Sequence, residues 1–591
     1  MTVIGIDLGT TNSSLAYSTG EGVSLFAIPQ LTNPAEVRAE ALLPSSLYIP
    51  GAKDFPEGAT ALPWDDSPTF VVGVLAQKRG AESAGRLVTS AKSWLSHGGV
   101  DRTSALLPLA APDGVSKISP VEASRQYLMH LRKAFEAQFG GEAQVLVTVP
   151  ASFDAVAREL TLEAATQAGL KDVVLLEEPQ AAFYAWIEKH PDWRERVQPG
   201  DLILVVDIGG GTTDFTLIAV TEAAGELRLE RVAVGEHILL GGDNIDLALA
   251  RTIEQELAAK NTKLDAMQLH MLWQRCRAAK EKLLEPGSHA DSEPVTILGR
   301  GTGLIGGTIK SKLQREVLER ILLDGFFPLA KSTDLPQRAR RVGLMETGLP
   351  YAQDAAITRH MAAFLRQQAA GAEHGSVRRT PSGLAAPTHV LFNGGVLRSE
   401  IARTRVMETL NSWLAEEGLA PAALLDGEDL MHAVARGAAY YGLARQGKGI
   451  RIRGGVPRTY YVGIESSMPA VPGFAPPLKA MAVAPFGMEE GTSVALPETE
   501  FGLLVGEAAE FRFFCSAVRK NDAPGTMIEV LGDDPAELAP IEVQLDSGGA
   551  REVVRVSLQA QVTETGLLQL FCVARDGRRW KLEFNVRERV S

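Results

Sequence analysis

The feature that most constrains this chain is a strand, an aspartate and a glycine turn that occur twice in the same order. Residues Leu202–Ile218 have the sequence LILVVDIGGGTTDFTLI, in which two apolar runs flank Asp207, three glycines and Asp214. So short a glycine turn between β-branched runs predicts a β-hairpin. The segment Val3–Ser13, VIGIDLGTTNS, repeats the pattern. This repetition predicts an α/β unit built of two related halves.

The residue types in these hairpins indicate a polyphosphate site. Glycines at a hairpin tip let the backbone approach a ligand and direct its N–H groups at phosphate oxygens. Asp7 and Asp207 would face each other across a divalent cation that bridges those phosphates. One glycine-rich turn alone would more often be structural, whereas two in matching context favour a ligand. We therefore expect a nucleotide and a cation in a cleft between the halves.

Composition excludes several other classes. The net charge of −13, from 72 acidic and 59 basic residues, disfavours nucleic-acid and membrane-surface partners. The three cysteines lie far apart without metal-ligand spacing, which indicates a reducing compartment. The chain enters a strand directly, with no signal-peptide pattern, and no apolar run approaches the roughly 20 residues of a membrane span. We expect a cytoplasmic protein.

The pattern of elements changes near residue 446. Strand and helix patterns alternate over 1–446, in lobes of about 1–200 and 201–446, and a basic, glycine-rich linker is expected over 447–457. Strand-length segments then predict an all-β sandwich-like domain over 458–591. Loops are expected from the first hairpin to about Asp66, and a glycine-rich hairpin over Gly299–Gly307. The expected helices include Ala76–Leu95, Ser119–Phe139, Phe153–Ala168, 179–186, Ala266–Leu284, Ile309–Leu329, Asp354–Gln367, Ser399–Leu414 and Asp429–Leu443.

Several motifs together resemble those of the heat shock protein 70 (DnaK-type) chaperones, in the actin-like ATPase superfamily. IGIDLGTTNS and VVDIGGGTTDF are similar to the two phosphate motifs, VTVPASF and EEPQAAF to the first connecting motif, and AVARGAAY to the second. FNGGVLR resembles the adenosine motif, and TETGLLQLFCVARDGRRWKLEF the last strands of the peptide-binding β-domain. The resemblance implies a duplicated actin-like (ribonuclease H-like) ATPase domain, a C-terminal β-sandwich-like domain and ATP-dependent chaperone activity.

The resemblance also implies roles for individual residues. Lys92 would orient the water that attacks the γ-phosphate, and Glu178 would lie on the same side. From local sequence alone, the alternatives are a solvated lysine at a helix end for Lys92 and a cap of the helix over 179–186 for Glu178. Asp7, Asp207 and Asp214 would hold Mg²⁺, and Thr212 with Asp214 would place water or K⁺. The other positions implied for ATP or ADP are Gly9, Thr10, Thr11, Asn12, Gly209, Gly210, Gly211, Thr213, Gly241, Gly242, Asp243, Lys280, Glu281, Leu284, Gly394, Gly395, Val396 and Arg398.

The adenosine side departs from the family pattern. Arg277 and Glu281 stand in reversed order relative to the family's acidic and basic pair, and Leu284 stands where the family has serine. Residues four apart share a helix face, so we expect the reversed pair to form a salt bridge. A carboxylate cannot stack on adenine as a guanidinium does. The prediction is weaker or less adenine-selective binding, although Lys280 and Arg398 are kept.

Other departures concern coupling and clients. The expected linker is basic rather than acidic, we expect no helical lid after the β-domain, and residues 336–386 have no counterpart in the family pattern. Pro150 and Arg158 match positions that, in the family, relay the nucleotide state to the β-domain. The alternative is that Pro150 ends a strand and Arg158 is a surface arginine of a helix. The expected partners are unfolded or partly folded protein segments, with J-domain and nucleotide-exchange co-chaperones. The alternative is a nucleotide-binding regulator that hydrolyses little; a small-molecule kinase or a filament protein fits less well.

Overall fold

The structure is a computed structural model, and it describes most of the chain. The described residues are 2–20, 22–109, 111–140, 142–223, 226–299, 308–337, 349–370, 378–427, 429–448, 456, 458–464, 478–488, 492–496, 500–506, 508–516, 518–530, 534–538, 541–544, 552–563 and 568–582. Most of the expected linker, the tip of the expected hairpin over Gly299–Gly307 and parts of 336–386 lie outside them.

The first half of the chain is organised by a mixed sheet in the order β11-β10-β1-β2-β3. The predicted hairpin is confirmed, because β1 (Thr2–Asp7) pairs antiparallel with β2 (Asn12–Ser18). β1 pairs in parallel with β10 (Ala143–Val149), and β10 with β11 (Val174–Glu177). Helices α3 (Pro120–Phe139) and α4 (Ala155–Gln167) contribute to its apolar core.

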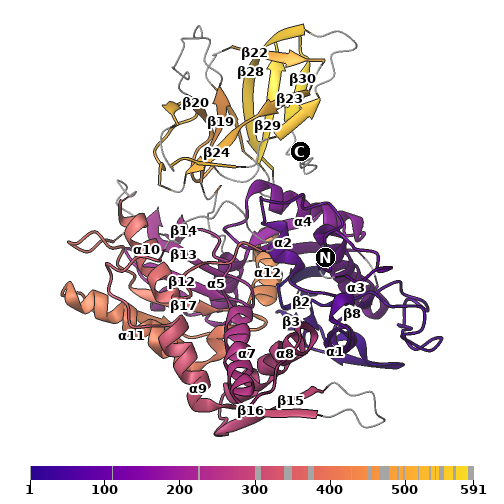
Figure 1. Ribbon diagram of the computed structural model, residues 1–591. Coiled ribbons are helices and arrows are strands. Elements are labelled where there is room, and N and C mark those ends of the chain that lie inside the picture. Colours follow the sequence, from indigo (N-terminus) through magenta and orange to yellow (C-terminus); the bar gives the residue numbers. More distant parts are fainter. Residues whose placement is uncertain are drawn as a thin grey trace, which may run out of the picture.

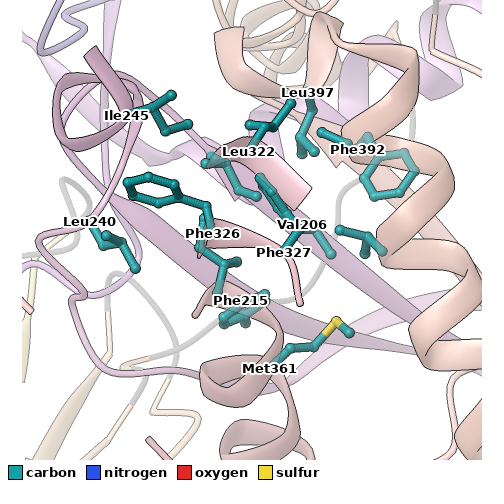
Figure 2. Close-up of a cluster of buried hydrophobic side chains, with 14 of the residues drawn as sticks. Val206, Phe215, Leu240, Ile245, Leu322, Phe326, Phe327, Met361, Phe392 and Leu397 are labelled. Atoms are coloured by element: carbon teal, nitrogen blue, oxygen red, sulfur yellow. The ribbon is translucent and has the colours of Figure 1, made fainter. Parts of the chain in front are cut away.

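The second half contains another mixed sheet. The order is β14-β13-β12-β17-β18, in which β12 (Leu202–Ile208) pairs antiparallel with β13 (Thr213–Ala223) and in parallel with β17 (His389–Asn393). Helices α7 (Gly242–Ala259) and α8 (Ala266–Leu283) cover its core, part of which is drawn in Figure 2. The mixed α/β architecture is thus confirmed, while duplication and the ribonuclease H-like class stay predictions.

Two helices join the sheets. α12 (Ala433–Leu443) packs on β1, β2 and β10 and lies against α5 (Glu178–Lys189), and Figure 1 shows both helices in the middle of the α/β body. The approach is close because α12 carries Gly437, where an added Cβ would lie 1.7 Å from the carbonyl oxygen of Ala181. The backbones of α5 and α12 are therefore in direct contact at this crossing.

Most predicted helices occur, with shifted ends. Ser119 caps α3 by accepting a hydrogen bond from the Glu122 N–H at 3.0 Å, as its position before proline predicts. The helix expected over Ile309–Leu329 is wrong in its first part, because residues 308–314 form β16 (Thr308–Gln314), paired with β15 (Ser292–Leu298). Alternate side chains of β16 are exposed, so one face of this strand is solvated. The helical pattern begins only at Arg315.

The expected long helix over residues 76–95 is also wrong. It is divided into α1 (Val74–Glu82), a 3₁₀ turn, β9 (Leu87–Val88) and α2 (Ala91–Leu95). β9 pairs with β7 (Leu47–Tyr48), so a tertiary strand contact overrides local helix propensity. The region expected as loops before Asp66 likewise holds short strands.

The described part of the C-terminal segment is built of strands, in Figure 1 in orange and yellow. One sheet has the order β25-β20-β19-β24-β26, and a second contains β21, β22, β28, β29 and β30. Side chains from both share one apolar core. The Asp576-Gly577 hairpin turn is confirmed, with Gly577 at φ +89° between β29 and β30. The domain boundaries and the missing lid stay predictions.

The remaining elements are short or peripheral. They are β3 (Ser24–Leu25), β4 (Ile28–Asn33), β5 (Glu36–Glu40), β6 (Leu43–Pro44), β8 (Val71–Val72), η1 (Ala84–Arg86), α6 (Trp193–Arg196), β14 (Glu226–Val234), α9 (Arg315–Arg320), the π-helical turn η2 (Ile321–Phe326), α10 (Ile357–Ala370), η3 (Gly395–Arg398), α11 (Glu400–Glu416), β18 (Ala423–Leu425), η4 (Ala444–Lys448), β19 (Thr459–Ile464), β20 (Lys479–Ala484), β21 (Ser493–Ala495), β22 (Phe501–Val505), β23 (Ala508–Phe511), β24 (Phe513–Ser516), β25 (Met527–Glu529), β26 (Ala536–Glu537), β27 (Ile541–Gln544), β28 (Glu552–Val562), β29 (Leu568–Ala574) and β30 (Arg579–Leu582).

Within the described ranges, every helix is too short or too polar to cross a bilayer. Cys276, Cys515 and Cys572 are free thiols, and all three are buried.

The crossing of α5 and α12 gives a stability prediction. Gly437→Ala is expected to lower the free energy of unfolding by about 2 kcal/mol or more, since overpacking a tight contact forces backbone shifts. Gly325→Ala is the matched control, because a Cβ there has no atom within 4 Å. Chemical denaturation of both variants measures the difference, and equal stability would contradict the close packing.

Candidate functional site

A cavity of about 330 Å³ lies between the two sheets, and its wall contains most of the residues singled out from the sequence. A volume of this order is in the range of small-molecule sites. The predicted residues on the wall are Asp7, Gly9, Thr10, Thr11, Asn12, Lys92, Glu178, Asp207, Gly209, Gly210, Thr212, Gly242, Asp243, Lys280, Glu281, Leu284, Gly394, Gly395, Val396 and Arg398. Those that do not line it are Gly211, Thr213, Asp214 and Gly241.

The two glycine turns pack against each other at one end of this cavity. A Cβ added to Gly210 would lie 1.7 Å from Oγ1 of Thr11, which belongs to the turn after β1. The N–H groups of Gly242 and Asp243, at the start of α7, donate to the carbonyl oxygens of Gly209 at 3.0 Å and Gly210 at 2.7 Å. These two donors stabilise the turn, so the first residues of α7 support the hairpin with their N–H groups.

Lys92 and Glu178 form a buried ion pair on the cavity wall. Their side chains are 7% and 12% exposed, so the alternative of a solvated helix-end lysine is wrong. Lys92 comes from α2, whereas Glu178 is the first residue of α5, and the Lys92 ammonium donates to Glu178 Oε1. Burial by itself would lower the pKa of the Lys92 ammonium, but Glu178 and Asp7 outweigh it and raise that pKa. The lysine is therefore held charged.

Asp7 and Asp207 stand at the same end, and both pKa values are raised. Burial is the main cause for Asp7, whose pKa rises to about 7, with Lys92 opposing the shift and Glu178 adding to it. Burial and Glu178 raise the pKa of Asp207 well above its ordinary value, although Asn393 Nδ2 donates to Asp207 Oδ2 at 2.7 Å. Three carboxyl groups thus surround one ammonium, and this excess of acidic groups is what a cation would relieve.

This carboxyl group set fits a cation shared with phosphate better than a closed metal site. Among the described residues, no three His, Cys, Asp or Glu side chains are grouped closely enough to enclose a metal ion. Mg²⁺ is usually held by one or two carboxylates together with substrate phosphates and water. Asp7 and Asp207 satisfy that requirement, and the paired glycine turns lie next to them.

Asp214 makes a different contact from the one expected. It stands directly opposite Asp207 in the β12–β13 register but is absent from the cavity wall. Ser152 Oγ, from the first half of the chain, donates to Asp214 Oδ1 and lies 2.7 Å from Nδ1 of His237. Asp214 therefore links the two halves behind the cavity, and a direct metal or K⁺ role stays a prediction.

A second charged network lies on the cavity wall at the start of α7. Arg277 pairs with Asp243 and, through Nε at 3.0 Å, with Asp246; Lys280 pairs with Asp246 at 2.7 Å. In the described structure, the recorded ion pairs of Arg277 are with these two aspartates, so the expected Arg277–Glu281 salt bridge is wrong. The reason lies in the tertiary structure, because α7 places two carboxylates next to the face of α8 that carries Arg277. Glu281 remains on the wall, and burial raises the pKa of its carboxyl group.

Several wall residues were not predicted as site residues from the sequence. Asp246 could have been found, since it stands one helical turn after Asp243 and shares its face. Asn393 could also have been found, because it precedes the glycines of FNGG. The other apolar residues of the wall that were not predicted are Leu42, Ile245, Leu322, Leu430, Met431 and Val434. Nothing in their local sequence distinguishes them from core residues.

Arg158, left open above, is buried rather than on the surface. Its guanidinium donates to Glu177 Oε1 at 2.8 Å and to the carbonyl oxygens of Phe153 and Ala151, both at 3.2 Å. Arg231 of β14 donates to the other oxygen of Glu177. The three side chains join the first sheet to the second, while a relay role for Arg158 stays a prediction.

Part of the chain is similar to known proteins. Residues 103–333 match the family model described as Hsp70 protein. Proteins named chaperone protein HscA homolog are 29% identical over 343 residues in Cupriavidus taiwanensis and 33% over 303 residues in Azotobacter vinelandii. Part of the chain is therefore similar to proteins of the heat shock protein 70 family.

The similarity to curated family members is partial. The match to the Cupriavidus taiwanensis protein covers 56% of this chain and 48% of that protein, and the Azotobacter vinelandii match covers 49% and 43%. A Pseudomonas aeruginosa (strain LESB58) protein of the same name is 32% identical over 289 residues, which is 48% of this chain and 42% of its own. The chain spans about half the length of the curated heat shock protein 70 relatives it matches.

The network around Arg277 gives the second prediction. Arg277→Met would leave Asp243 and Asp246, 6% and 1% exposed, with Lys280 as the remaining cation. Removing one partner of a buried ion pair typically destabilises by about 3–5 kcal/mol. Arg251→Met is the control, since Arg251 is 56% exposed in a surface pair and should change stability by less than about 0.5 kcal/mol. Urea unfolding measures both, and an equally small loss in the two variants would contradict the structural role of Arg277.

Proposed function

We propose that this chain is an ATP-dependent chaperone of the heat shock protein 70 type, which hydrolyses ATP in the cavity between its two sheets. The observation that carries the proposal is the buried Lys92–Glu178 pair beside Asp7 and Asp207, next to two interlocked glycine turns. The similarity of residues 103–333 to the Hsp70 protein family model and the name chaperone in the relatives support the same proposal.

The reaction requires few groups, and the cavity wall has them. Phosphoryl transfer to water depends on positioning and charge neutralisation more than on covalent chemistry. The glycine turns would hold the phosphates, and Asp7 and Asp207 would hold Mg²⁺ with its water shell. When bound, the cation neutralises charge on the phosphate oxygens. Lys92, held charged by Glu178, would orient the attacking water, and Thr212 would support it, with K⁺ as an additional cation near Asp214.

The nucleoside would lie at the end lined by Lys280, Glu281 and Arg398. Arg277 also lines the cavity but is paired with two aspartates, and Glu281 carries a carboxyl group at the wall. Weaker or less adenine-selective binding of ATP and ADP than in typical family members is part of this proposal.

Client binding is assigned to the C-terminal strands. Unfolded or partly folded segments would bind there, and J-domain and nucleotide-exchange co-chaperones are the partners that the family relationship suggests. A cytoplasmic location and the absence of nucleic-acid and membrane partners belong to the same proposal. Stimulation of ATP turnover by an unfolded peptide would support it, and no stimulation by any unfolded peptide would count against client handling of this kind.

Loss of Lys92 tests the proposed hydrolysis. Lys92→Ala is expected to lower the rate of ADP formation by about 100-fold or more, because a charged donor that acts on the transition state is removed. Nucleotide binding should remain, and Lys171→Ala, whose side chain is 83% exposed, should behave as wild type. Turnover in the presence of Mg²⁺ and calorimetric ADP binding separate the outcomes. Equal, very slow turnover in wild type and variant would favour the nucleotide-binding regulator.

The base end gives a separate prediction. Glu281→Arg places a guanidinium where the family has one, and it is expected to strengthen ATP binding relative to GTP several-fold through stacking on adenine. Lys282→Arg, on the adjacent exposed position of α8, is the control. Affinities of both nucleotides for each variant measure the ratio. Wild-type selectivity already equal to that of a typical family member would contradict the proposed role of Glu281.

A further inference from the structure

Two oppositely charged side chains on the cavity wall stand near each other without pairing. Glu281 of α8 and Arg398 of η3 both line the cavity. Among the described residues, no hydrogen bond or ion pair is recorded for either side chain, whereas Arg277 and Lys280 beside them are bound to α7. The two charges are close enough for Arg398 to oppose the rise in the pKa of Glu281. An acceptor and a donor are thus both available to a ligand.

The wall changes in character along α8. One face of this helix lines the cavity with Arg277, Lys280, Glu281, Leu284 and Glu285. The Lys280 ammonium donates to the carbonyl oxygen of Gly242 at 3.4 Å, so this part of the face lies against the glycine turns. The carboxyl groups of Glu281 and Glu285 come later on the same face. Because like charges repel, these two groups disfavour a phosphate chain and leave their part of the wall to the uncharged part of a nucleotide.

The same two elements also supply apolar surface. Leu284 of α8 and Val396 of η3 both line the cavity, so each element contributes one apolar and one charged side chain. A nucleobase has two apolar faces and a polar edge. Leu284 and Val396 match the faces, and Glu281 and Arg398 match the edge, which is the usual composition of a small-molecule site.

Guanine and adenine differ in what their edges offer to such a pair. Guanine accepts hydrogen bonds at O6 and N7 and donates them from N1–H and its 2-amino group, whereas adenine has an amino group in place of O6 and a lone pair in place of N1–H. A guanidinium can bind O6 and N7 together, and a carboxylate can accept from N1–H and the 2-amino group together. With adenine, Arg398 loses an acceptor and Glu281 loses a donor.

The environment of Glu281 strengthens this distinction. Burial raises the pKa of its carboxyl group, and neighbouring lysine and arginine side chains oppose the rise. Hydrogen-bond donors stabilise the charged form of a desolvated carboxylate. Guanine supplies two such donors at one edge. A site whose polar groups are paired by one ligand rejects the analogue that leaves them unpaired.

We propose that Glu281 and Arg398 select guanine, and that a guanine nucleotide is the preferred ligand of the cavity. The inference rests on the proposed function, because it requires a nucleotide whose phosphates lie at the glycine turns, and it replaces only the base. The roles proposed for Lys92, Glu178 and the two aspartates do not depend on which base is bound.

Calorimetric binding of nucleoside diphosphates to the full chain, with Mg²⁺ present, tests the base preference without turnover. The wild-type dissociation constant for GDP should be about tenfold lower than that for ADP, the size expected for one bidentate contact. The inosine diphosphate, which lacks the 2-amino group, should bind more weakly than GDP. This comparison needs no variant.

Glu281→Gln tests the residue directly. A glutamine amide can donate to the 2-carbonyl oxygen of xanthine but offers one acceptor instead of two to guanine. The variant should lose GDP affinity and gain affinity for the xanthosine diphosphate, each by about tenfold. A gain of binding cannot result from misfolding. Arg398→Met should also reduce the ratio of GDP to ADP affinity, because O6 and N7 lose their donor.

Glu256→Gln is the matched control. Glu256 is exposed on α7 and lies outside the cavity wall, so the same change of charge there should leave every dissociation constant as in wild type. Wild-type binding of ADP as tight as or tighter than that of GDP would overturn the inference and leave the proposed function. Unchanged preferences in Glu281→Gln and Arg398→Met would do the same. Absence of binding of every diphosphate to wild type would instead overturn the proposed function, and the inference with it.

Discussion

The site depends on one electrostatic constraint, the burial of three carboxyl groups around a single ammonium between the two sheets. Lys92 is the cation of this group, and Asp7, Asp207 and Glu178 exceed its charge. Such an arrangement is costly unless a further cation or protons compensate for it. The cavity therefore has an excess of acidic groups, for which the positive charge of a nucleotide-bound Mg²⁺ would compensate.

Rigid packing behind the cavity keeps this arrangement in place. α5 begins at Glu178 and crosses α12 at Gly437, so the carboxylate is attached to the tightest backbone contact between the halves. The Ser152–Asp214 hydrogen bond and the Arg158–Glu177–Arg231 cluster add polar links across the same boundary. A change in the separation of the sheets must disturb these contacts, because buried polar groups are costly when left unpaired.

Two charged groups on the cavity wall are balanced in different ways. Around Lys92, acidic groups outnumber the single ammonium, and a further cation or protons must compensate. Around α8, Arg277 and Lys280 are paired with Asp243 and Asp246. The second group is balanced by the protein alone, which is why we assign the stronger interactions with a charged ligand to the first.

The sequence by itself determined the two hairpins, the capped helix α3 and the positions of Asp7, Asp207 and the glycine turns. These features depend on residues within a few positions of each other, so local pattern suffices. Only the tertiary structure decided that residues 308–314 form a strand, that β9 divides an expected helix, and that Arg277 pairs with α7 instead of Glu281. The partners of β9 and Arg277 lie far away in the chain, and β16 is decided by hairpin pairing with β15. Local propensity of a few tenths of a kcal/mol, on the order given for single residues, yields to pairing and burial.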